Sequence, residues 1–242
     1  MTDRIVIVTG SAGGIGSAIV RAFETKGDTV IGLDLVDGFD IRDPGACQAA
    51  ADEIKEEYGR IDVLCGNAGV GAVGDILAAT VDDWTRVFDV NVFGLAHLTG
   101  AVIPVMRRQG SGAIVNTCSI AAEVGLVERV VYSASKGAVL AMTRAIAADE
   151  VRYGIRVNCV CPGTVDGPWV RRLIDNSDDP AATLAALAAR QPTWRLITAE
   201  EVAAAVIYLA DPSTATTGHS LQIDGGLAAV RVIDSREQDK ID

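Results

Sequence analysis

Short apolar segments alternate along the chain with longer segments in which apolar residues recur at helical spacing. The short segments are residues 5–8, 29–33, 61–65, 112–117, 156–161 and 220–223. They are too short for core helices and are therefore predicted to be strands. The longer segments predict helices at residues 17–26, 44–58, 80–107, 133–152 and 199–210. Strands that are apolar throughout and separated by amphipathic helices predict an α/β fold of the doubly wound type, with helices on both faces of a parallel sheet.

Two segments depart from this alternation. Residues 163–197 are irregular and contain three prolines, with an alanine-rich helix candidate at 180–190. Excursions of this kind often form lids, so we expect a substrate lid here. Residues 228–242 are expected to form a C-terminal tail, in which 229–233 are a candidate end strand that docks on a neighbouring subunit. No composition break, repeat or linker divides the 242 residues, so we expect a single domain.

Acidic residues outnumber basic ones by 32 to 21, and the formal net charge is −11. Such a surface repels nucleic-acid backbones and anionic membranes on average, so neither is an expected partner. The N-terminus lacks a signal-peptide pattern, and the uninterrupted apolar runs fall well short of the about 18 residues that span a bilayer. We therefore expect a cytoplasmic protein.

The cysteines are odd in number, form no C-x-x-C pair and have no histidine cluster nearby. They are Cys47, Cys65, Cys118, Cys159 and Cys161. This pattern favours reduced, buried thiols. Because His97 and His219 also lack metal-ligand neighbours in the sequence, we predict no metal site.

A glycine-rich turn, Thr-Gly-Ser-Ala-Gly-Gly-Ile-Gly at residues 9–16, separates the first predicted strand from the first helix. Glycines allow a tight turn and the close approach of backbone N–H groups to a diphosphate at a helix N-terminus. The spacing differs from the usual G-x-G-x-x-G fingerprint, and such turns also occur for packing alone. The turn therefore predicts a dinucleotide site only together with further residues.

Asp34 ends the second predicted strand, 18 residues after Gly16. A carboxylate at this place accepts hydrogen bonds from the adenosine ribose hydroxyls and repels a 2′-phosphate. No Arg or Lys stands at residues 35–38 or within the glycine-rich turn. The pattern favours NAD over NADP, and the alternative is a solvated acid in a loop.

Tyr132 and Lys136 are four residues apart in a predicted helix, so both project from one face. The ammonium group favours the phenolate, which takes a proton from an alcohol. Ser119 follows the fourth predicted strand, at the sheet edge where doubly wound folds bind ligands, and its hydroxyl is a candidate for binding the substrate oxygen. Asn91 is an amide within the apolar segment 88–93, which predicts a kinked helix with a bound water, or else simple capping.

Together these residues resemble the short-chain dehydrogenase/reductase superfamily, over residues 4 to about 227. The motifs that carry the resemblance are the turn at 9–16, Asp34, Asn67-Ala68-Gly69, Asn91, Ser119, Tyr132, Lys136 and Cys161-Pro162-Gly163. The resemblance implies a Rossmann-type sheet of seven parallel strands, a catalytic tetrad of Asn91, Ser119, Tyr132 and Lys136, and a homotetramer. The residues that it assigns to the cofactor are Gly10, Ser11, Gly14, Ile15, Gly16, Asp34, Leu35, Asp40, Ile41, Asn67, Ala68, Gly69, Tyr132, Lys136, Pro162, Gly163 and Val165.

Two positions depart from the family pattern. Gly66 stands where the family usually has the first Asn of N-N-A-G, and Gly167 stands where a cofactor-binding Thr is common. The first departure predicts a looser strand contact. The second removes one hydrogen bond to the nicotinamide carboxamide.

A narrower resemblance lies in Arg129-Val130-Val131-Tyr132, in residues 158–166 and in Arg190-Gln191-Pro192. These segments are similar to the branch that holds cytosolic type 2 hydroxybutyrate dehydrogenase and the ketodeoxy-fuconate (sugar acid) dehydrogenases. In that branch, arginines that match Arg129 and Arg190 meet a substrate carboxylate, onto which a guanidinium forks with two hydrogen bonds. Arginines at a lid are also often plain surface charges. Further lid candidates are Arg171 and Arg172.

The sequence thus predicts an NAD-dependent oxidoreductase that interconverts a secondary alcohol and a ketone on a small hydroxy acid or sugar acid. The predicted substrate contacts are Ser119, Arg129, Tyr132 and Arg190. One alternative is a 3-ketoacyl-thioester reductase, against which Asp34 argues because reductive biosynthesis usually draws on NADPH. The other is a non-catalytic module that senses the dinucleotide, against which the intact tyrosine–lysine pair argues.

Overall fold

A single parallel sheet forms the centre of the computed structural model, which describes residues 4–231. Its six strands lie in the order β2-β1-β3-β4-β5-β6. They are β1 (Ile5–Thr9), β2 (Thr29–Leu33), β3 (Val63–Gly66), β4 (Gly112–Thr117), β5 (Ile155–Pro162) and β6 (Ser220–Ile223). The strand order runs outward from the centre in both directions, which confirms the doubly wound fold that the sequence predicts.

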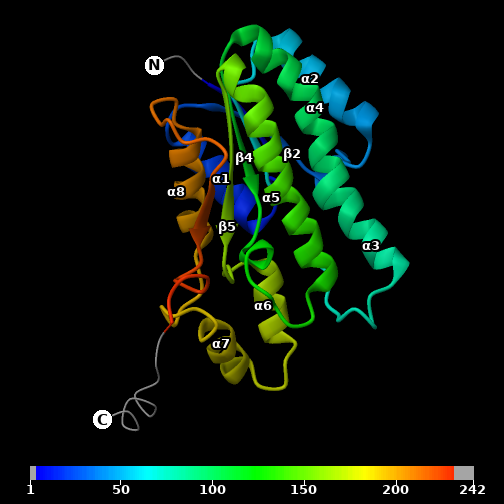
Figure 1. The fold of residues 1–242 in the computed structure, drawn as a ribbon, viewed down its shortest axis with the longest axis vertical. Helices are drawn as coiled ribbons and strands as arrows, with labels where there is room; N and C mark the ends of the chain where they lie inside the picture. Colours follow the sequence, from blue (N-terminus) through cyan, green and yellow to red (C-terminus); the bar gives the residue numbers. More distant parts are fainter. Residues whose placement is uncertain (1–3, 232–242) are drawn as a thin grey trace.

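Helices cover both faces of the sheet. They are α1 (Gly14–Glu24), α2 (Pro44–Tyr58), α3 (Val81–Phe88), α4 (Leu95–Gln109), α5 (Val130–Glu150), α6 (Pro168–Asp175), α7 (Pro180–Ala188) and α8 (Ala199–Ala210). Figure 1 shows α1 and α8 on one face and α2, α4 and α5 on the other. In β1, Ile5 and Ile7 pack on the α2–α4 side, while Val6 and Val8 pack on the α1–α8 side. Successive side chains of a strand point to opposite faces, so burial on both faces explains why the strands are apolar throughout.

The resemblance implied seven strands, whereas the described residues form six, with β2 at one edge of the sheet. After β2 the chain makes one 3₁₀ turn at Leu35–Asp37, which ends at Gly38 with φ of +85°. A short loop then leads straight into α2, so no segment remains to pair with the free side of β2. The candidate end strand at 229–233 is not a strand in its described part, and its last two residues lie outside the described residues.

Local signals set several helix ends. The carboxylate of Asp43 accepts a hydrogen bond from the backbone N–H of Gly45 at 2.7 Å at the start of α2, which ends at Gly59 with φ of +73°. At the start of α8, Thr198 and Glu201 form a reciprocal capping box. These contacts satisfy N–H groups that the first turn of a helix leaves unpaired.

The helix predicted at 80–107 is a continuous helical run, Val81–Gln109, with a π-helical turn at Asp89–Gly94 in its middle. Among the described residues it is the helix that is long and apolar enough to cross a bilayer, with a mean hydropathy of 1.4 over 18 residues. The run is not uninterruptedly apolar, since it contains Asp89, Asn91 and His97. Leu98, Val102 and Met106 of this run are buried in the core, so its apolar face is used in packing on the sheet.

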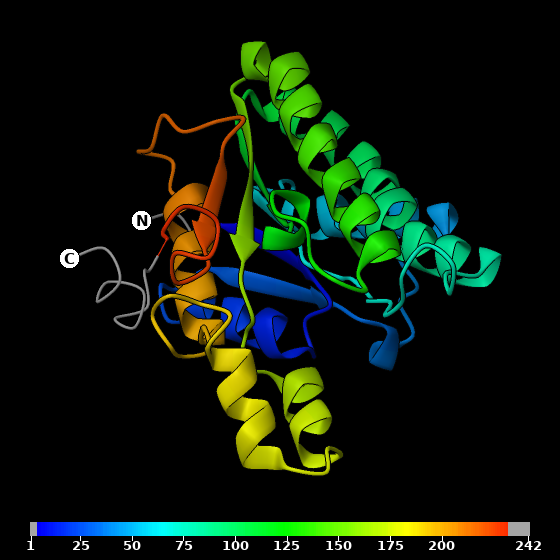
Figure 2. The same cartoon turned by 60° about the horizontal axis from the view of Figure 1, so that its bottom comes forward.

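Residues 163–197, which we call the lid segment, leave the sheet after β5 and return before α8. The helix predicted at 180–190 corresponds to α7, whereas α6, in which Val170 is buried, was not predicted. A parallel bridge between Val165 and Ile197 joins the two ends of the segment. Figure 2 shows α6 and α7 projecting together beyond the sheet.

Candidate active site

The carboxyl ends of the central strands meet at one edge of the sheet, on the side from which α6 and α7 project (Figure 2). Gly10 follows β1, Asn67 follows β3, Ser119 comes two residues after β4, and Pro162 ends β5. Ligands of doubly wound sheets bind outside this edge, where the strand order reverses. The fold therefore brings predicted site residues from four strands to one place.

The glycine-rich turn wraps closely around the start of α1. Gly10 has φ of +63°, and a Cβ on Gly16 would lie 2.0 Å from the Gly10 carbonyl oxygen, so both positions require glycine. Gly14 lies against the lid segment, since a Cβ there would be 2.8 Å from Cδ of Pro168. The residue that precedes the helix, Gly13, provides no side-chain cap. The N–H groups at the start of α1 are thus offered to an anion such as a diphosphate.

Asp34 joins the end of β2 to the glycine-rich turn. Its Oδ2 accepts a hydrogen bond from the backbone N–H of Ala12 at 2.9 Å, and its Oδ1 accepts one from Val36 at 3.2 Å. Ser11 of the same turn lies against Gly32 of β2. A carboxylate oxygen accepts two hydrogen bonds, so Asp34 keeps capacity for ribose hydroxyls. The arrangement fits the adenosine half of a dinucleotide.

Leu35, Asp40 and Ile41, which are also predicted to contact the cofactor, lie in the loop between β2 and α2. Leu35 is 66% exposed, whereas Ile41 is buried against Gly94 of the π-helical turn. Asp40 forms an ion pair with Arg42 at 2.6 Å, and the hydrogen bonds from this guanidinium hold the pKa of Asp40 below its usual range. Asp40 therefore neutralises a cation beside the predicted adenine site.

Asn67 ties the ends of three strands together. Its Nδ2 donates to the carbonyl of Thr9 at 3.0 Å, and its Oδ1 accepts from the Thr117 hydroxyl at 3.1 Å. The hydroxyl of Thr9 also accepts from the backbone N–H of Ala68 at 2.9 Å. The sequence predicts Asn67 and Ala68 as neighbours of the ribose, and the structure adds a framework role that fixes this edge.

Gly66, the first departure from the family pattern, lies in a crowded place. A Cβ there would lie 2.5 Å from Cδ1 of Leu95 and 2.7 Å from Oδ1 of Asn116. These neighbours fill the space of a larger side chain. Gly66 still pairs with Asn116 in the β3–β4 ladder, so the strand contact is kept.

Tyr132 and Lys136 lie one turn apart near the start of α5. Nζ of Lys136 is 5.8 Å from the centre of the Tyr132 ring and donates to the carbonyl of Thr117 at 2.7 Å. The lysine is only 4% exposed, and a charge that is poorly screened by water acts strongly on its neighbours. Oγ of Ser119 accepts from the backbone N–H of Ala121 at 3.2 Å. This contact orients the serine hydroxyl, whose own proton can be donated to a substrate oxygen.

Asn91 projects from the π-helical turn. Its Oδ1 accepts from the backbone N–H of Val70 at 2.8 Å, and its Nδ2 donates to the Val70 carbonyl at 2.9 Å and to Oγ of Ser135 at 3.0 Å. A Cβ on Gly69 would lie 3.3 Å from Asn91 Oδ1 and 3.4 Å from Lys136 Nζ, so Gly69 separates the two side chains narrowly. The distortion expected at Asn91 is confirmed as a π-helical turn. A water held by Asn91 stays a prediction.

Arg129 and Arg190 come from distant parts of the chain and lie close enough to repel each other. Burial lowers the pKa of Arg129, the like charge of Arg190 lowers it further, and Glu128 and Tyr132 act in the opposite direction. Nη1 of Arg129 donates to the carbonyl of Glu128 at 2.9 Å. Within residues 4–231 neither arginine forms an ion pair. Two neighbouring guanidinium groups without a counter-ion, one of them near Tyr132, can bind a carboxylate.

Two other arginines of the lid segment are already paired, whereas the candidate Arg172 forms no ion pair within the described residues. Arg171 lies 2.8 Å from Asp166, and Arg195 lies 2.5 Å from Glu201. The candidate Arg171 is thus committed to a carboxylate of the chain itself, in contrast to Arg190.

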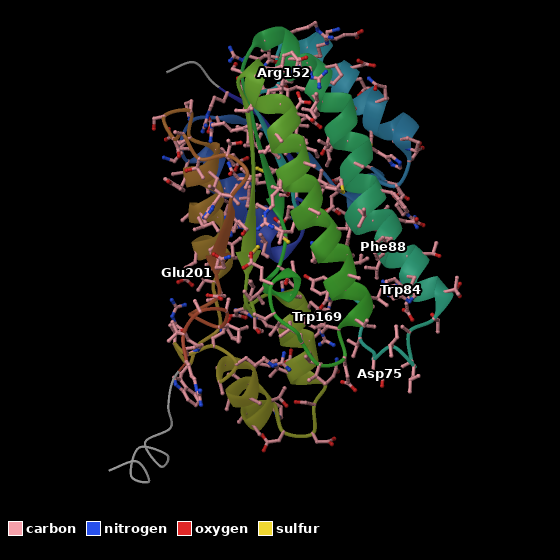
Figure 3. The ribbon with its side chains drawn as sticks, in the orientation of Figure 1. Asp75, Trp84, Phe88, Arg152, Trp169 and Glu201 are labelled. Atoms are coloured by element: carbon pink, nitrogen blue, oxygen red, sulfur yellow. The ribbon has the colours of Figure 1, made fainter. Side chains whose placement is uncertain are left out.

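Two further side chains of the lid segment are ones to which the sequence analysis assigned no role. Gln191 is fully buried, accepts from the backbone N–H of Thr164 at 2.8 Å and donates to the carbonyl of Arg195. It therefore fixes the segment that carries Arg190. Trp169, in the first turn of α6, is 54% exposed and adds apolar surface (Figure 3). The sequence around Gln191 and Trp169 does not indicate these roles, because they depend on how the lid segment folds back onto the sheet.

Comparison with known proteins supports an oxidoreductase. Residues 37–228 match the family model described as "Enoyl-(Acyl carrier protein) reductase". The chain is 39% identical to "Dehydrogenase/reductase SDR family member 6" of Rattus norvegicus over 239 residues, which are 93% of this chain and 98% of the relative. It is 36% identical to "Cis-4-hydroxycyclohexanecarboxylate dehydrogenase" of Sinomonas cyclohexanicum over 249 residues, with 94% of this chain and 98% of the relative covered. The ligand-free aldohexose dehydrogenase of Thermoplasma acidophilum has 35% identity and a TM-score of 0.90, with 96% of each chain covered.

Fold, site and relatives together define an oxidoreductase that acts on alcohol or ketone groups. The chain belongs to the short-chain dehydrogenase/reductase family. Solved structures with the same fold include an NAD⁺-bound xylitol dehydrogenase and ElxO with NADP bound, so the family uses nicotinamide dinucleotides of both kinds. The resemblance to the superfamily is confirmed, and the narrower branch stays a prediction.

Proposed function

We propose that this protein is an NAD-dependent dehydrogenase that interconverts a secondary alcohol and a ketone on a small hydroxy acid or sugar acid. The observation that carries the proposal is the pair Arg129 and Arg190. Neither has a counter-ion within the described residues, and Arg129 lies near both Arg190 and Tyr132. The relative from Sinomonas is, by its name, a dehydrogenase of an alcohol that also bears a carboxylate. Both points support a substrate with one anionic group and one hydroxyl.

The residues present fit a nicotinamide dinucleotide, whose ring supplies the hydride acceptor when it is bound. Tyr132, as phenolate, takes the proton of the substrate hydroxyl, and Ser119 donates a hydrogen bond to the same oxygen. Lys136 stabilises the phenolate and is aimed by the Thr117 carbonyl. Asn91 keeps Val70 and Ser135 in place beside this lysine and is the proposed holder of a proton-relay water.

The preference for NAD rests on Asp34 and on the Asp40–Arg42 pair. A 2′-phosphate at the ribose would lie next to the Asp34 carboxylate, which is an unfavourable contact between like charges. Arg42, the cation in the loop between β2 and α2, is bound by Asp40 at 2.6 Å and is not free to attract a phosphate.

A substrate screen tests the proposal. The full chain is incubated with NAD or NADP and with hydroxy acids, sugar acids, neutral sugars and steroids, and formation of the reduced cofactor is followed by absorbance. We expect NAD-dependent turnover that is best with carboxylate-bearing alcohols. Turnover restricted to neutral alcohols would contradict the proposed substrate class.

A second candidate is a 3-ketoacyl-thioester reductase, which the description of the matching family model favours. This activity predicts faster reduction of a ketoacyl thioester with NADPH than oxidation of any hydroxy acid with NAD. A dinucleotide-sensing module, in contrast, predicts cofactor binding with no turnover in either direction.

We further propose that the enzyme is a cytoplasmic homotetramer whose partners are small-molecule substrates. The support is the resemblance to the family and the net charge of −11, which disfavours nucleic acid and anionic membranes. Sedimentation equilibrium would give four times the chain mass, and a monomer would contradict the assembly.

A further inference from the structure

Three thiols from two neighbouring strands meet behind the catalytic residues. Cys118 directly follows β4, and Cys159 and Cys161 lie on β5, two residues apart and hence on the same face. Their Sγ atoms all lie within 4.8 Å of one another. The backbone N–H of Cys118 donates to the carbonyl of Val160 at 2.9 Å, so the β4–β5 ladder fixes this proximity.

The cluster is buried but borders on one exposed carboxylate. Cys118 is 2% exposed and Cys159 and Cys161 are 0% exposed, and Leu95 is among the apolar residues packed with them. Sγ of Cys161 donates to Oε1 of Glu123 at 3.7 Å. Glu123 is exposed, and the cluster therefore has a fourth donor on its solvent side.

The electrostatics distinguish one of the three sulfurs. Hydrogen bonds from Cys159 and Cys161 lower the pKa of Cys118, and the ammonium of Lys136 acts in the same direction. The contact with Cys118 and burial raise the pKa of Cys159 and Cys161.

The spacing suits a thiophilic ion. Zn²⁺ binds thiolates tetrahedrally at about 2.3 Å, which sets the sulfur atoms about 3.8 Å apart, so the cluster needs to contract by about 1 Å at most. Thiolates with one carboxylate are a donor set for zinc-like ions and not for Mg²⁺ or Ca²⁺, which prefer oxygen. Cysteines that served only as small apolar residues would need neither mutual contact nor a carboxylate.

We propose that Cys118, Cys159 and Cys161, with Glu123 on the open side, bind one divalent ion of the zinc type. Three sulfur–metal bonds form as the thiols release their protons to solvent, and no group is oxidised or reduced. The site is distinct from the proposed dehydrogenase chemistry and does not depend on it.

The ion would be coupled to the catalytic residues through Cys118. This residue precedes Ser119, and its thiol donates to the backbone carbonyl of Lys136 at 3.2 Å. Metal binding removes that thiol proton and hence that hydrogen bond. A bound ion therefore changes how the segments carrying Ser119 and Lys136 are held.

Cobalt titration of the reduced, metal-free full chain tests the site. We expect one Co²⁺ per chain, with thiolate-to-cobalt charge-transfer absorption and the visible bands of a tetrahedral ion, both lost when Zn²⁺ displaces cobalt. Cys118→Ala and Cys161→Ala should abolish the charge-transfer absorption. Glu123→Gln should weaken binding about 10- to 100-fold, as loss of a metal-supporting carboxylate does.

Cys47→Ala is the matched control, because Cys47 is a buried free thiol that packs in a different core cluster. It should bind cobalt as the wild type does. X-ray absorption of the zinc-loaded wild type, which needs no variant, should show three sulfur neighbours. Fewer than three sulfurs, no cobalt absorption in the wild type, or an equal loss in Cys47→Ala would overturn the proposal.

Discussion

Replacing Arg190 by glutamine removes one guanidinium of the proposed carboxylate site and leaves a polar side chain of similar reach. Arg190 is exposed, and its charge repels Arg129, so the substitution breaks no core contact and relieves a repulsion. A surface change of this kind alters the free energy of unfolding by about 0.5 kcal/mol or less. The effect on activity therefore reports on substrate binding and not on folding.

The expected loss follows from the strength of one charged contact. A hydrogen bond to a charged group contributes about 1.5–3 kcal/mol, which corresponds to about 10- to 150-fold in kcat/KM. Arg190 is exposed, so water screens its charge, and the loss of kcat/KM in Arg190→Gln should be near 10-fold. Arg129 is half-buried, and Arg129→Gln should lie toward the upper end because screening there is weaker.

The assay compares a hydroxy acid that is active in the substrate screen with its primary amide. NAD-dependent oxidation is measured for both at low and high salt, in wild type and variants. The loss should appear with the acid and not with the amide, and it should shrink at high salt. Arg171→Gln is the control, because Asp166 already holds this guanidinium at 2.8 Å. Equal losses for acid and amide, or an unchanged rate with the acid, would refute the carboxylate role.

Three further outcomes test the site and the fold. Tyr132→Phe should lower kcat by about 10²- to 10⁴-fold, the range of a lost general base, while calorimetry still detects NAD binding; near-normal turnover would remove the proposed base. Asp34→Ser should raise kcat/KM with NADP and lower it with NAD, and a wild type that prefers NADP would be inconsistent with the cofactor assignment. Hydrogen bonds from Arg195 lower the pKa of Glu201 from 4.5 to about 2, so the ionised carboxylate stabilises the fold above pH 4.5 and this contribution is lost as the pH falls toward 2. The side chain of Glu201 is 36% exposed, so we expect the unfolding free energies of wild type and Glu201→Gln to differ by about 0.2–1 kcal/mol at neutral pH; a difference that persists unchanged to pH 2 would contradict this account.

Elements with explicit end signals were predictable from the sequence. The helix at 44–58 was predicted to the residue, because Asp43 and Pro44 mark its start and Gly59 its end. The distortion at Asn91 was also predictable, since an amide in an apolar run demands partners that a regular helix does not supply. In contrast, α6 was missed because it is only eight residues long and lies within an irregular segment, although Trp169, Val170, Leu173 and Ile174 recur at helical spacing.

In the candidate site, residues in local sequence motifs were predictable, whereas residues brought together only by the fold were not. Asp34, Tyr132 and Lys136 lie in motifs with fixed spacing, so they could be identified from the sequence. In the structure, Asp34 directly follows β2, and Tyr132 and Lys136 lie near the start of α5. The seventh strand was inferred from the family, and the short connection after β2 leaves no residues for it. The thiol cluster was invisible because Cys118 and Cys159 become neighbours only through the register of β4 and β5.

The bridge between Val165 and Ile197 makes the residues between them a closed insertion on the sheet. Because both ends are joined at its base, this insertion is a natural point at which to exchange α6 and α7 for those of a relative. Such an exchange would replace the surroundings of Arg190, whereas Ser119, Arg129 and Tyr132 lie outside the insertion and would be kept.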